Sequence, residues 1–524
     1  MPESSITQFA DLLKPDGPVA IVIKQALAPA NEDDPIIFPP SYPLTMFKGR
    51  VHTVSDGDYR VSVELPSDPK AKKNEKGTDQ AAGYNIDRFP DGTNSCEIDS
   101  PQSQANRIEP EFKKPEYCNL VPQIKIRVGN DPSSSTIVNL LDAGHRAGDA
   151  VVRLSSLASE FHKAFLDAKA GDHFTLATLA PTSLLFGVWD SRSTQVKIQR
   201  VLKASIRANN VRECTRSAQF TPAVDYVAAG AVDADRDQGE GDQNPLSSEG
   251  MKYALAVQKA GGVMLTPASE LTRTVNLNLA AIRALRGADD RHTEALQAYI
   301  LGLALVAVTI DQDLNLREGC NLRFKDEKDA PKLIPRRGEP KPEALDHKKV
   351  IAFATASAKD FFSVAGIPFD NKDHLDAIFE AGVAEEFLGL EKKEDRDKVR
   401  ALGPLTAATL KRFRDQSVDP LKLVTDALAK AKKALPKWKK GQPPVHDQMT
   451  LNPVHDALKL LSGDPTIPEN AQALASELAD YLTVDQPDSH AVLKHIEAKV
   501  RAFKKSQKDG ADTGTGTGEN LPNK

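Results

Sequence analysis

Residues 18–29, PVAIVIKQALAP, decide how the fold begins. The run is apolar and rich in β-branched side chains, and Gly17 and Pro29 bound it. A short apolar run between such residues is typical of a buried β-strand. We therefore predict that the folded part of the chain opens with a strand.

The flanking sequence adds further strands and helices. Alternation of polar and apolar residues predicts strands at 57–65 and 121–128, and a continuous apolar run predicts a buried strand at 182–189. Apolar residues at helical spacing predict helices over 137–169 and 279–310. This part of the chain therefore mixes strands with helices.

The composition of the chain changes after Arg336. Residues 336–346, RRGEPKPEALD, predict a linker that ends a first domain at 1–335. Residues 347–507 are mostly Ala, Leu, Lys, Glu and Asp at helical spacing, which predicts a separate helical domain. Residues 508–524, KDGADTGTGTGENLPNK, predict a disordered tail because they cannot bury apolar surface.

The overall composition limits the possible functions. The 524 residues include 68 basic and 73 acidic side chains, a net charge of −5, so any nucleic-acid surface must be local. The four cysteines form no CxxC pair, which argues against a disulfide framework and a cysteine-based zinc site. The N-terminus lacks a secretory pattern, and Leu296–Ile310 fits a buried core helix better than a membrane span. We expect a cytoplasmic protein without a cofactor.

Residues 99–107, DSPQSQANR, combine a helix start with many hydrogen-bonding side chains. Asp99 or Ser100 can cap a helix whose first residue is Pro101. None of the donors titrates near neutral pH, so they suit a phosphate or ribose cradle better than catalysis. The alternative is an elaborate helix cap with a solvated polar face. The candidate RNA-binding residues of this segment are Ser100, Gln102, Ser103, Gln104, Asn106 and Arg107.

Residues 186–216 form a locally basic segment. They contain seven basic and two acidic residues, and Trp189 stands near their start. Basic residues spaced along a segment beside an aromatic ring fit a groove that follows a phosphate backbone. A solvated charged face is the alternative. The candidate RNA-binding residues here are Trp189, Arg192, Lys197, Arg200, Lys203 and Arg207.

Residues 430–440, KAKKALPKWKK, hold six lysines, one tryptophan and no acid. Lysine is a compact point charge that suits non-specific contact with phosphate. The alternative is a solvated helix end at a proline break. The lysines considered for DNA binding are Lys432, Lys433, Lys437, Lys439 and Lys440.

Common catalytic motifs are missing from the sequence: it has no GxxxxGK[ST], GxSxG or HExxH. His145 and Asp149 lie four residues apart and could share a helix face in a metal-dependent phosphohydrolase, but such a site needs more ligands. Alternatively, Asp149 pairs with Arg146 or Arg153 on a polar face.

Four segments together resemble a known family. They are DSPQSQANR at 99–107, LLDAGHRAGDAVVR at 140–153, FGVWDSRSTQVKIQRVLKASIRANNV at 186–211 and TRSAQFTPAVDY at 215–226. In this order they resemble the RAMP-superfamily backbone subunit, Cas-seven or Csb-one, of type I-U (I-G) CRISPR effector complexes. The resemblance covers about residues 15–330.

The resemblance implies an α+β fold, a modified RRM-like (ferredoxin-like) palm with long insertions, to which the C-terminal helical domain is appended. It implies a structural subunit, not an enzyme. Copies would pack head-to-tail along one CRISPR RNA, whose bases pair with target DNA. Further implied partners are a large subunit and a fused Cas-five/Cas-six-type subunit, with no membrane. Arg146, in the second matching segment, joins the candidate RNA-binding residues.

Several alternatives stay open at this point. The acidic loop 229–250 could meet a basic surface of a neighbouring copy, or it could be a flexible insertion. The C-terminal helical domain could line the path of target or displaced DNA, or it could be a packing extension. Two other functions remain: a metal-dependent phosphohydrolase or nuclease on His145 and Asp149, and an RNA-binding protein outside CRISPR.

Overall fold

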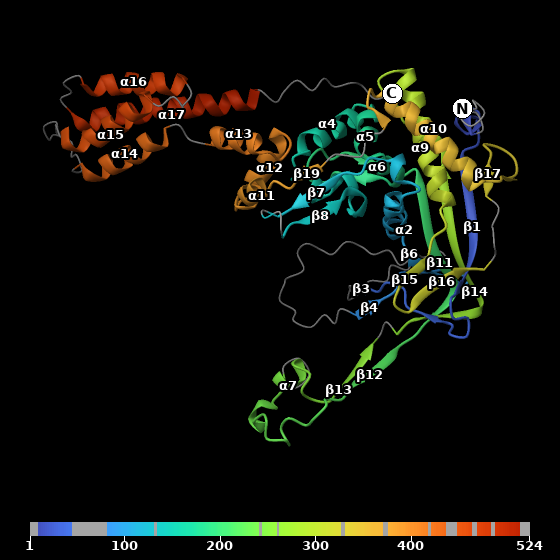
Figure 1. Ribbon diagram of the computed structural model, residues 1–524. Coiled ribbons are helices and arrows are strands. Elements are labelled where there is room, and N and C mark those ends of the chain that lie inside the picture. The colour runs from blue at the N-terminus through green and yellow to red at the C-terminus, as the bar shows by residue number, and fades with distance from the viewer. Residues whose placement is uncertain are drawn as a thin grey trace. The chain divides into compact units, whose positions relative to one another are not determined.

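The structure, a computed structural model, falls into two compact units, Met1–Thr406 and Ala407–Lys524, which are described separately below (Figure 1). The predicted strand at 57–65 lies outside the described residues. The structure describes residues 9–44, 81–129, 131, 134–239, 244–258, 261–325, 331–369, 376–417, 421–435, 448–463, 469–483 and 488–513.

The first unit is built on a large antiparallel sheet. Its long central strand, β14 (Val263–Asn278), pairs on one edge with β1 (Ala20–Pro29) and on the other with β11 (Leu202–Glu213). β1 confirms the strand predicted at 18–29. The strand order is β15–β16–β1–β14–β11–β6–β5, with β17 also pairing with β1. The outer strands are β15 (Leu314–Arg317), β16 (Cys320–Phe324), β17 (Lys332–Ile334), β6 (Asn94–Asp99) and β5 (Ile86–Arg88).

The alternation along β11 explains why the sheet has two unlike faces. Leu202, Ala204, Ile206 and Ala208 are buried, whereas Lys203 and Arg207, which alternate with them, are exposed. Successive side chains of a strand point to opposite faces, so the buried set and the charged set are separated. The helices pack on the buried face over Leu202 and Ala204, whereas Ile206 belongs to a second apolar cluster with residues of β6, β15 and β16.

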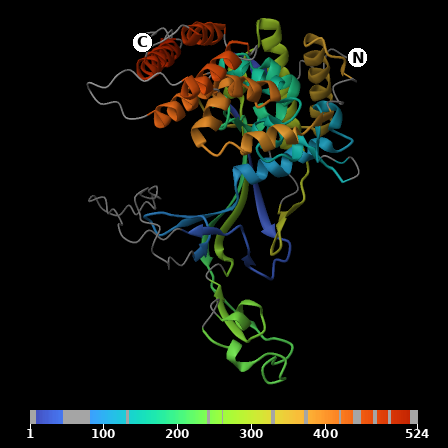
Figure 2. The same cartoon turned by 90° about the vertical axis from the view of Figure 1, so that its left-hand side faces the viewer.

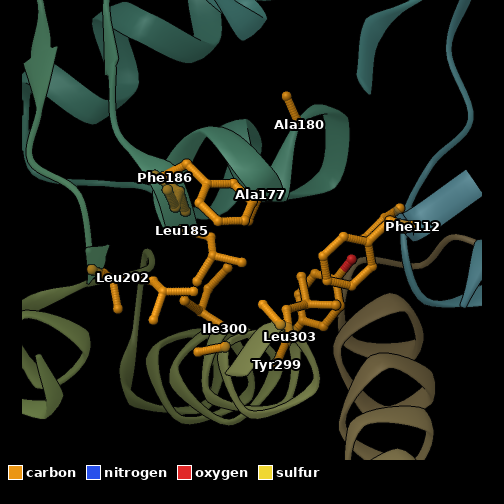
Figure 3. Packing of buried hydrophobic residues seen from close by; sticks show 14 of the residues in the cluster. Phe112, Ala177, Ala180, Leu185, Phe186, Leu202, Tyr299, Ile300 and Leu303 are labelled. Carbon is orange, nitrogen blue, oxygen red and sulfur yellow. The ribbon is translucent and has the colours of Figure 1, made fainter. Parts of the chain in front are cut away.

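Helix α9 (Asp290–Thr309) lies at the centre of this packing, preceded by α8 (Leu279–Ala284). Together they confirm the helical region predicted at 279–310. By length and composition α9 could cross a membrane, but most of its side chains are buried in the core. In Figure 3 Ile300 points toward Leu185, which lies in the helical segment 181–186 of the same core. The core therefore accounts for the apolar character of α9.

Helix α10 (His347–Val364) packs directly against α9. A Cβ added at Gly302 would lie 2.8 Å from Ala354 Cα, so the helices can approach this closely only because position 302 has no side chain. Across the same contact the Tyr299 ring stacks on Phe361 with 4.6 Å between ring centroids. α10 thus belongs to the core of the first unit.

Because α10 packs in the first unit, the domain boundary does not lie at the predicted linker. The sequence places the boundary at 336–346, but part of that segment forms β18 (Lys341–Pro342), which pairs with β17, and α10 follows in the first core. The chain divides between Thr406 and Ala407 instead. Composition could not locate the boundary, because α10 has the same apolar periodicity as the helices beyond it.

Two predicted elements in the first unit are wrong. Residues 137–169 are not one helix: they begin in β8 (Thr136–Asn139) and reach α4 (Ala158–Lys169) through short turns, one of which holds Arg146 at a φ of 52°. The strand predicted at 182–189 is mainly helix α6 (Pro181–Phe186). A short run that is buried on all sides has no period that distinguishes helix from strand.

Smaller elements extend the first unit. The strand predicted at 121–128 is β7 (Lys125–Val128), which pairs with β8 and with β19 (Asp376–Ile378). Between β11 and β14 the chain forms a two-stranded ribbon, β12 (Arg216–Phe220) and β13 (Ala254–Gln258). The ribbon carries the acidic segment and projects away from the helical layer (Figure 2).

The second unit is helical, as predicted for this part of the chain. Its apolar core includes Leu428, Val454, Leu478 and Ile496, one from each of four helices. The last helix continues to Thr513, so the predicted tail begins as helix, and residues 514–524 lie outside the described part. The helices are α13 (Ala407–Ser417), α14 (Lys422–Ala434), α15 (Gln448–Ser462), α16 (Glu469–Thr483) and α17 (Ser489–Thr513).

Truncation tests this division. We expect a chain that ends at residue 406 to keep a cooperative thermal transition, because it retains α9 and α10 together. A chain that ends at residue 345 removes α10 and exposes Tyr299 and the apolar face of α9 to water, so it should aggregate. The soluble yield of each chain and its thermal unfolding in a calorimeter are the two measurements to compare. A soluble, cooperatively folding 1–345 chain would contradict the role of α10.

Candidate nucleic-acid interface

The helix start predicted at 99–107 is present as α2 (Pro101–Ile108). Ser100 is its N-cap, and its Oγ accepts a hydrogen bond from the Ser103 backbone N–H at 3.1 Å. The two serine hydroxyls also lie 3.1 Å apart. Both serines therefore serve the local cap that sequence analysis gave as the alternative.

Two other candidates of this segment have partners inside the protein. Buried Gln104 donates from Nε2 to Asp99 Oδ2 at 2.7 Å, and its Oε1 accepts from Arg273 Nε at 2.9 Å. Arg107 donates from Nε to the same Asp99 oxygen at 3.2 Å and from Nη2 to the Leu316 carbonyl at 2.8 Å. These bonds fasten α2 to the sheet.

Arg273, the centre of this network, is a buried cation on β14. Two more glutamines bind its guanidinium: Gln25 Oε1 accepts at 2.6 Å and Gln312 Oε1 at 3.0 Å. Burial lowers the pKa of Arg273 to about 10, while the Asp99 charge opposes that shift. Arg273 belongs to no motif in the sequence, and only its position in a strand could have suggested that it faces inward.

The outward side of α2 meets the segment that precedes α3 (Ala150–Arg153). Gln102 donates from Nε2 to Asn106 Oδ1 at 3.1 Å and to the Gly144 carbonyl at 2.9 Å. Asn106 Oδ1 also accepts from Arg146 Nη2 at 3.2 Å. Gln102 and Asn106 are the most exposed of the candidates in the α2 segment, while the Arg107 side chain stays 37% exposed despite its internal bonds.

Arg146 forms a buried ion pair with Glu109. Its Nε lies 2.7 Å from Glu109 Oε2, and both side chains are almost fully buried. Burial raises the pKa of Glu109 to about 7, although the neighbouring Arg146 charge acts in the opposite direction. Arg146 Nη1 also donates to the Gly187 carbonyl at 3.3 Å. The geometry thus gives Arg146 a structural role and leaves its predicted RNA contact untested.

The basic segment begins as a hairpin of β9 (Val188–Trp189) and β10 (Lys197–Ile198). Buried Asp190 holds its turn by accepting from the Thr194 backbone N–H and hydroxyl, each at 2.8 Å. The Trp189 side chain is 57% exposed, and Lys197 Nζ lies 5.7 Å from its ring centroid. Arg192 is exposed in the turn. This hairpin therefore presents an aromatic face with cations beside it.

The hairpin and α2 belong to one surface. A Cβ added at Gly148 would lie 3.0 Å from the Trp189 carbonyl, so the segment that contacts α2 also touches β9. We call this surface the α2–hairpin surface. Its exposed members are Gln102, Asn106, Trp189, Arg192 and Lys197.

The remaining candidates follow β11. Lys203 and Arg207 point to the face of the sheet opposite the helices, while Arg200 is half-buried before the strand. Arg207 Nη1 donates to Asp87 Oδ2 at 2.7 Å. Lys203 pairs in register with Asn276 of β14. This polar face, here called the open face, is rich in hydroxyl, amide and lysine side chains.

The open face also holds lysines that the sequence analysis missed. A hollow of about 910 Å³ lies over β1 and β14. Its lining includes Lys24, Lys325 and Lys332 together with threonines and Glu270, and about half of the lining residues are apolar, among them Val22 and Leu265. Lys24 lies opposite Thr274 in the ladder. The apolar run PVAIVIKQALAP indicated a buried strand. It could not indicate that Lys24 would lie near Lys325 and Lys332, which are some 300 residues later in the chain.

The candidate residues therefore divide into four groups rather than forming one site. Gln104 and Arg146 are buried, five candidates lie on the α2–hairpin surface, and Lys203 and Arg207 lie on the open face. The remaining four, Ser100, Ser103, Arg107 and Arg200, are half-buried. In the second unit Lys432 forms an ion pair with Glu497, and Lys433 is exposed. Lys437, Lys439 and Lys440 lie outside the described residues.

His145 and Asp149 form no helix face, since each lies in a turn. Asp149 caps α3 by accepting from the Val151 backbone N–H at 3.1 Å, and its Oδ2 is 3.5 Å from His145 Nδ1. Among the residues that the structure describes, no three His, Cys, Asp or Glu side chains lie together as a metal site.

Part of the chain is similar to a known family. Residues 21–213 match the family described as CRISPR-associated protein GSU0053. This confirms the resemblance to a CRISPR-associated family and supports a role in CRISPR defence. The matched range runs from β1 to the end of β11 and includes α2 and the hairpin. No curated protein matches the chain.

The Arg146–Glu109 pair gives a prediction about stability. Arg146→Ala leaves a buried carboxyl without its cation, which should lower the free energy of unfolding by about 3–5 kcal/mol. Replacing both residues with methionine should recover much of this loss, because no buried charge remains unpaired. Denaturant unfolding without RNA measures both effects. If Arg146→Ala leaves the free energy of unfolding unchanged but weakens RNA binding, Arg146 contacts RNA instead.

Proposed function

We propose that this chain is a CRISPR RNA-binding backbone subunit of a type I-U/I-G effector complex that acts in antiviral defence. The observation that carries the proposal is the family match over residues 21–213, because that range contains the α2–hairpin surface and β11 of the open face. Both surfaces combine cations with neutral hydrogen-bonding groups, which suits contact with an RNA backbone.

The topology of the first unit supports an RRM-like palm. Within the sheet, β16, β1, β14 and β11 are neighbours and antiparallel. Helices connect β1 to β11, and α8 and α9 connect β14 to β15 and β16. This order corresponds to the split β-α-β pattern of ferredoxin-like folds, with the ribbon as an insertion between β11 and β14, the second and third of these strands along the chain.

The open face and the α2–hairpin surface would contact different parts of the RNA. Lysine and arginine on the open face would contact phosphates without reading base identity. Trp189 on the α2–hairpin surface offers a ring on which a base can stack, and Lys197 beside it can neutralise the next phosphate. Guide bases elsewhere would stay free to pair with target DNA, so base pairing would supply the sequence specificity.

The proposal includes the partners of the subunit. Copies would pack head-to-tail along one CRISPR RNA, together with a large subunit and a fused Cas-five/Cas-six-type subunit in the cytoplasm. The chain would be structural rather than enzymatic. For the alternative phosphohydrolase, the described residues supply no third ligand beside His145 and Asp149, so the geometry supports RNA binding better.

The RNA that accompanies the purified protein tests this proposal. We expect RNA of uniform length with repeat-derived sequence when the protein is produced together with a CRISPR array and the other subunits. RNA of random sequence would favour a general RNA-binding protein. Metal-dependent cleavage that is lost in His145→Ala would favour the phosphohydrolase.

The α2–hairpin surface gives a quantitative prediction. Arg192→Ala combined with Lys197→Ala should weaken RNA binding and reduce the slope of log K against log salt by about 1.4, at about 0.7 per lost phosphate contact. The matched control is Lys392→Ala with Lys393→Ala, two exposed lysines near the start of α12 (Lys393–Leu402). Equal slopes for both variants would show that the hairpin does not contact the backbone.

A further inference from the structure

The helices of the second unit carry unlike charges. α14 has four lysines and one aspartate, and α17 has six lysines or arginines and three acids. α16 has three acids and no cation, while α15 has one lysine and one aspartate. The positive charge of the four helices is therefore concentrated on α14 and α17.

Side-chain contacts show that α14 and α17 lie side by side and run in opposite directions. Lys504 Nζ donates to Thr425 Oγ1 at 2.9 Å, and Lys432 forms an ion pair with Glu497. Residue numbers thus rise along one helix as they fall along the other. The side of α17 away from α14 faces α16, where the Tyr481 and His495 rings stack at 4.4 Å.

Each of the two helices carries a row of cations on its exposed side. Lys422 and Lys433 are eleven residues apart on α14, as are Lys494 and Lys505 on α17, and Arg501 lies between the latter two. Eleven residues are close to three helical turns, so the members of each row share a face. All five side chains are exposed, opposite the buried residues of their helices.

Most of these cations lack an acidic partner. Within the described part of the second unit, no ion pair involves Lys422, Lys433, Lys494 or Lys505. Two acids lie on or beside the rows: Asp426 on α14, and Glu497, which binds both Lys432 and Arg501. We call the two rows and the residues between them the α14–α17 face. Its charge is strongly positive.

The dimensions of this face limit what can bind it. Each row spans about 16 Å at about 1.5 Å per residue, and packed helices lie about 8–10 Å apart. Ala429 and Ala498 lie within the rows, so small side chains leave the cations accessible. Two straight rows of point charges suit two phosphate backbones that border a groove.

We infer that the α14–α17 face is a second nucleic-acid-binding surface, which holds the phosphate backbones of a double helix without reading sequence. Single strands usually require aromatic rings for base stacking, and neither row contains one. The surface lies outside the range that matches the CRISPR-associated family. It thus goes beyond the proposed guide-binding function and would add a sequence-independent grip on duplex nucleic acid.

The experiment measures binding of the full chain to a 30-base-pair DNA duplex that is not complementary to any bound guide. Lys422, Lys433, Lys494 and Lys505 are replaced together with glutamine. The slope of log K against log salt should fall by about 3.6, at about 0.9 per lost contact. The control carries the same four changes at lysines outside this face: Lys348, Lys349, Lys392 and Lys393.

A second variant tests the face in the opposite direction. Glu497→Gln removes an acid and releases Lys432 and Arg501, so it should tighten duplex binding at least several-fold. Unchanged slopes in the four-lysine variant, with no gain in Glu497→Gln, would overturn the inference. Tighter binding of the matching single strand than of the duplex would also overturn it.

The RNA carried by the protein separates this inference from the proposed function. The four-lysine variant should retain the same RNA as the parent chain, because the α2–hairpin surface is unchanged. If the parent carries no repeat-derived RNA but its duplex binding still falls in the variant, the proposed function fails and the α14–α17 face stands. If RNA is retained and duplex binding is unchanged, only the inference about this face fails.

Discussion

The first unit depends on the burial of one helix that is apolar on nearly every side. α9 cannot leave one face to water, so the sheet, α10 and the α4–α6 segment must surround it. Its contact with α10 in turn requires Gly302, because a Cβ there would meet the α10 backbone at Ala354. One face of the sheet packs against the helices around α9, and the polar side chains of the strands therefore lie on the opposite, open face. The helical packing thus determines which side of the sheet stays available for a ligand.

The sequence correctly predicted elements that depend only on neighbouring residues, such as a β-branched run or a helix cap. The β-branched run at 18–29 and the Ser100–Pro101 helix start both agree with the structure. The continuous apolar run at 182–189 was misread as a strand, because burial on all sides removes the contrast between helix and strand. Composition also misplaced the domain boundary, because α10 resembles the later helices in composition but packs in the first core.

The candidate site shows the same limit. Residue types singled out Trp189 and Lys197 in one basic segment, and the structure brings the two side chains together, while their contact with RNA stays a prediction. Residue types could not show that Gln104 is turned inward by Arg273, a residue 169 positions away. Nor could they bring Lys24 and Lys332 to one hollow, since only the pairing of β1 with β17 does so. Which side chains lie next to one another on a sheet depends on how the strands pair, and strand pairing cannot be read from a single segment of sequence.

The pairing of β1 with β14 also has a consequence for synthesis of the chain. Ala20 lies opposite Asn278, so the first strand must wait for more than 250 residues to leave the ribosome before its partner exists. At about 5–20 residues per second, that delay is roughly 10–50 s. During this time the apolar side of β1 and its unpaired backbone are open to other chains. Nascent copies on one messenger are therefore most exposed to mutual aggregation before β14 emerges.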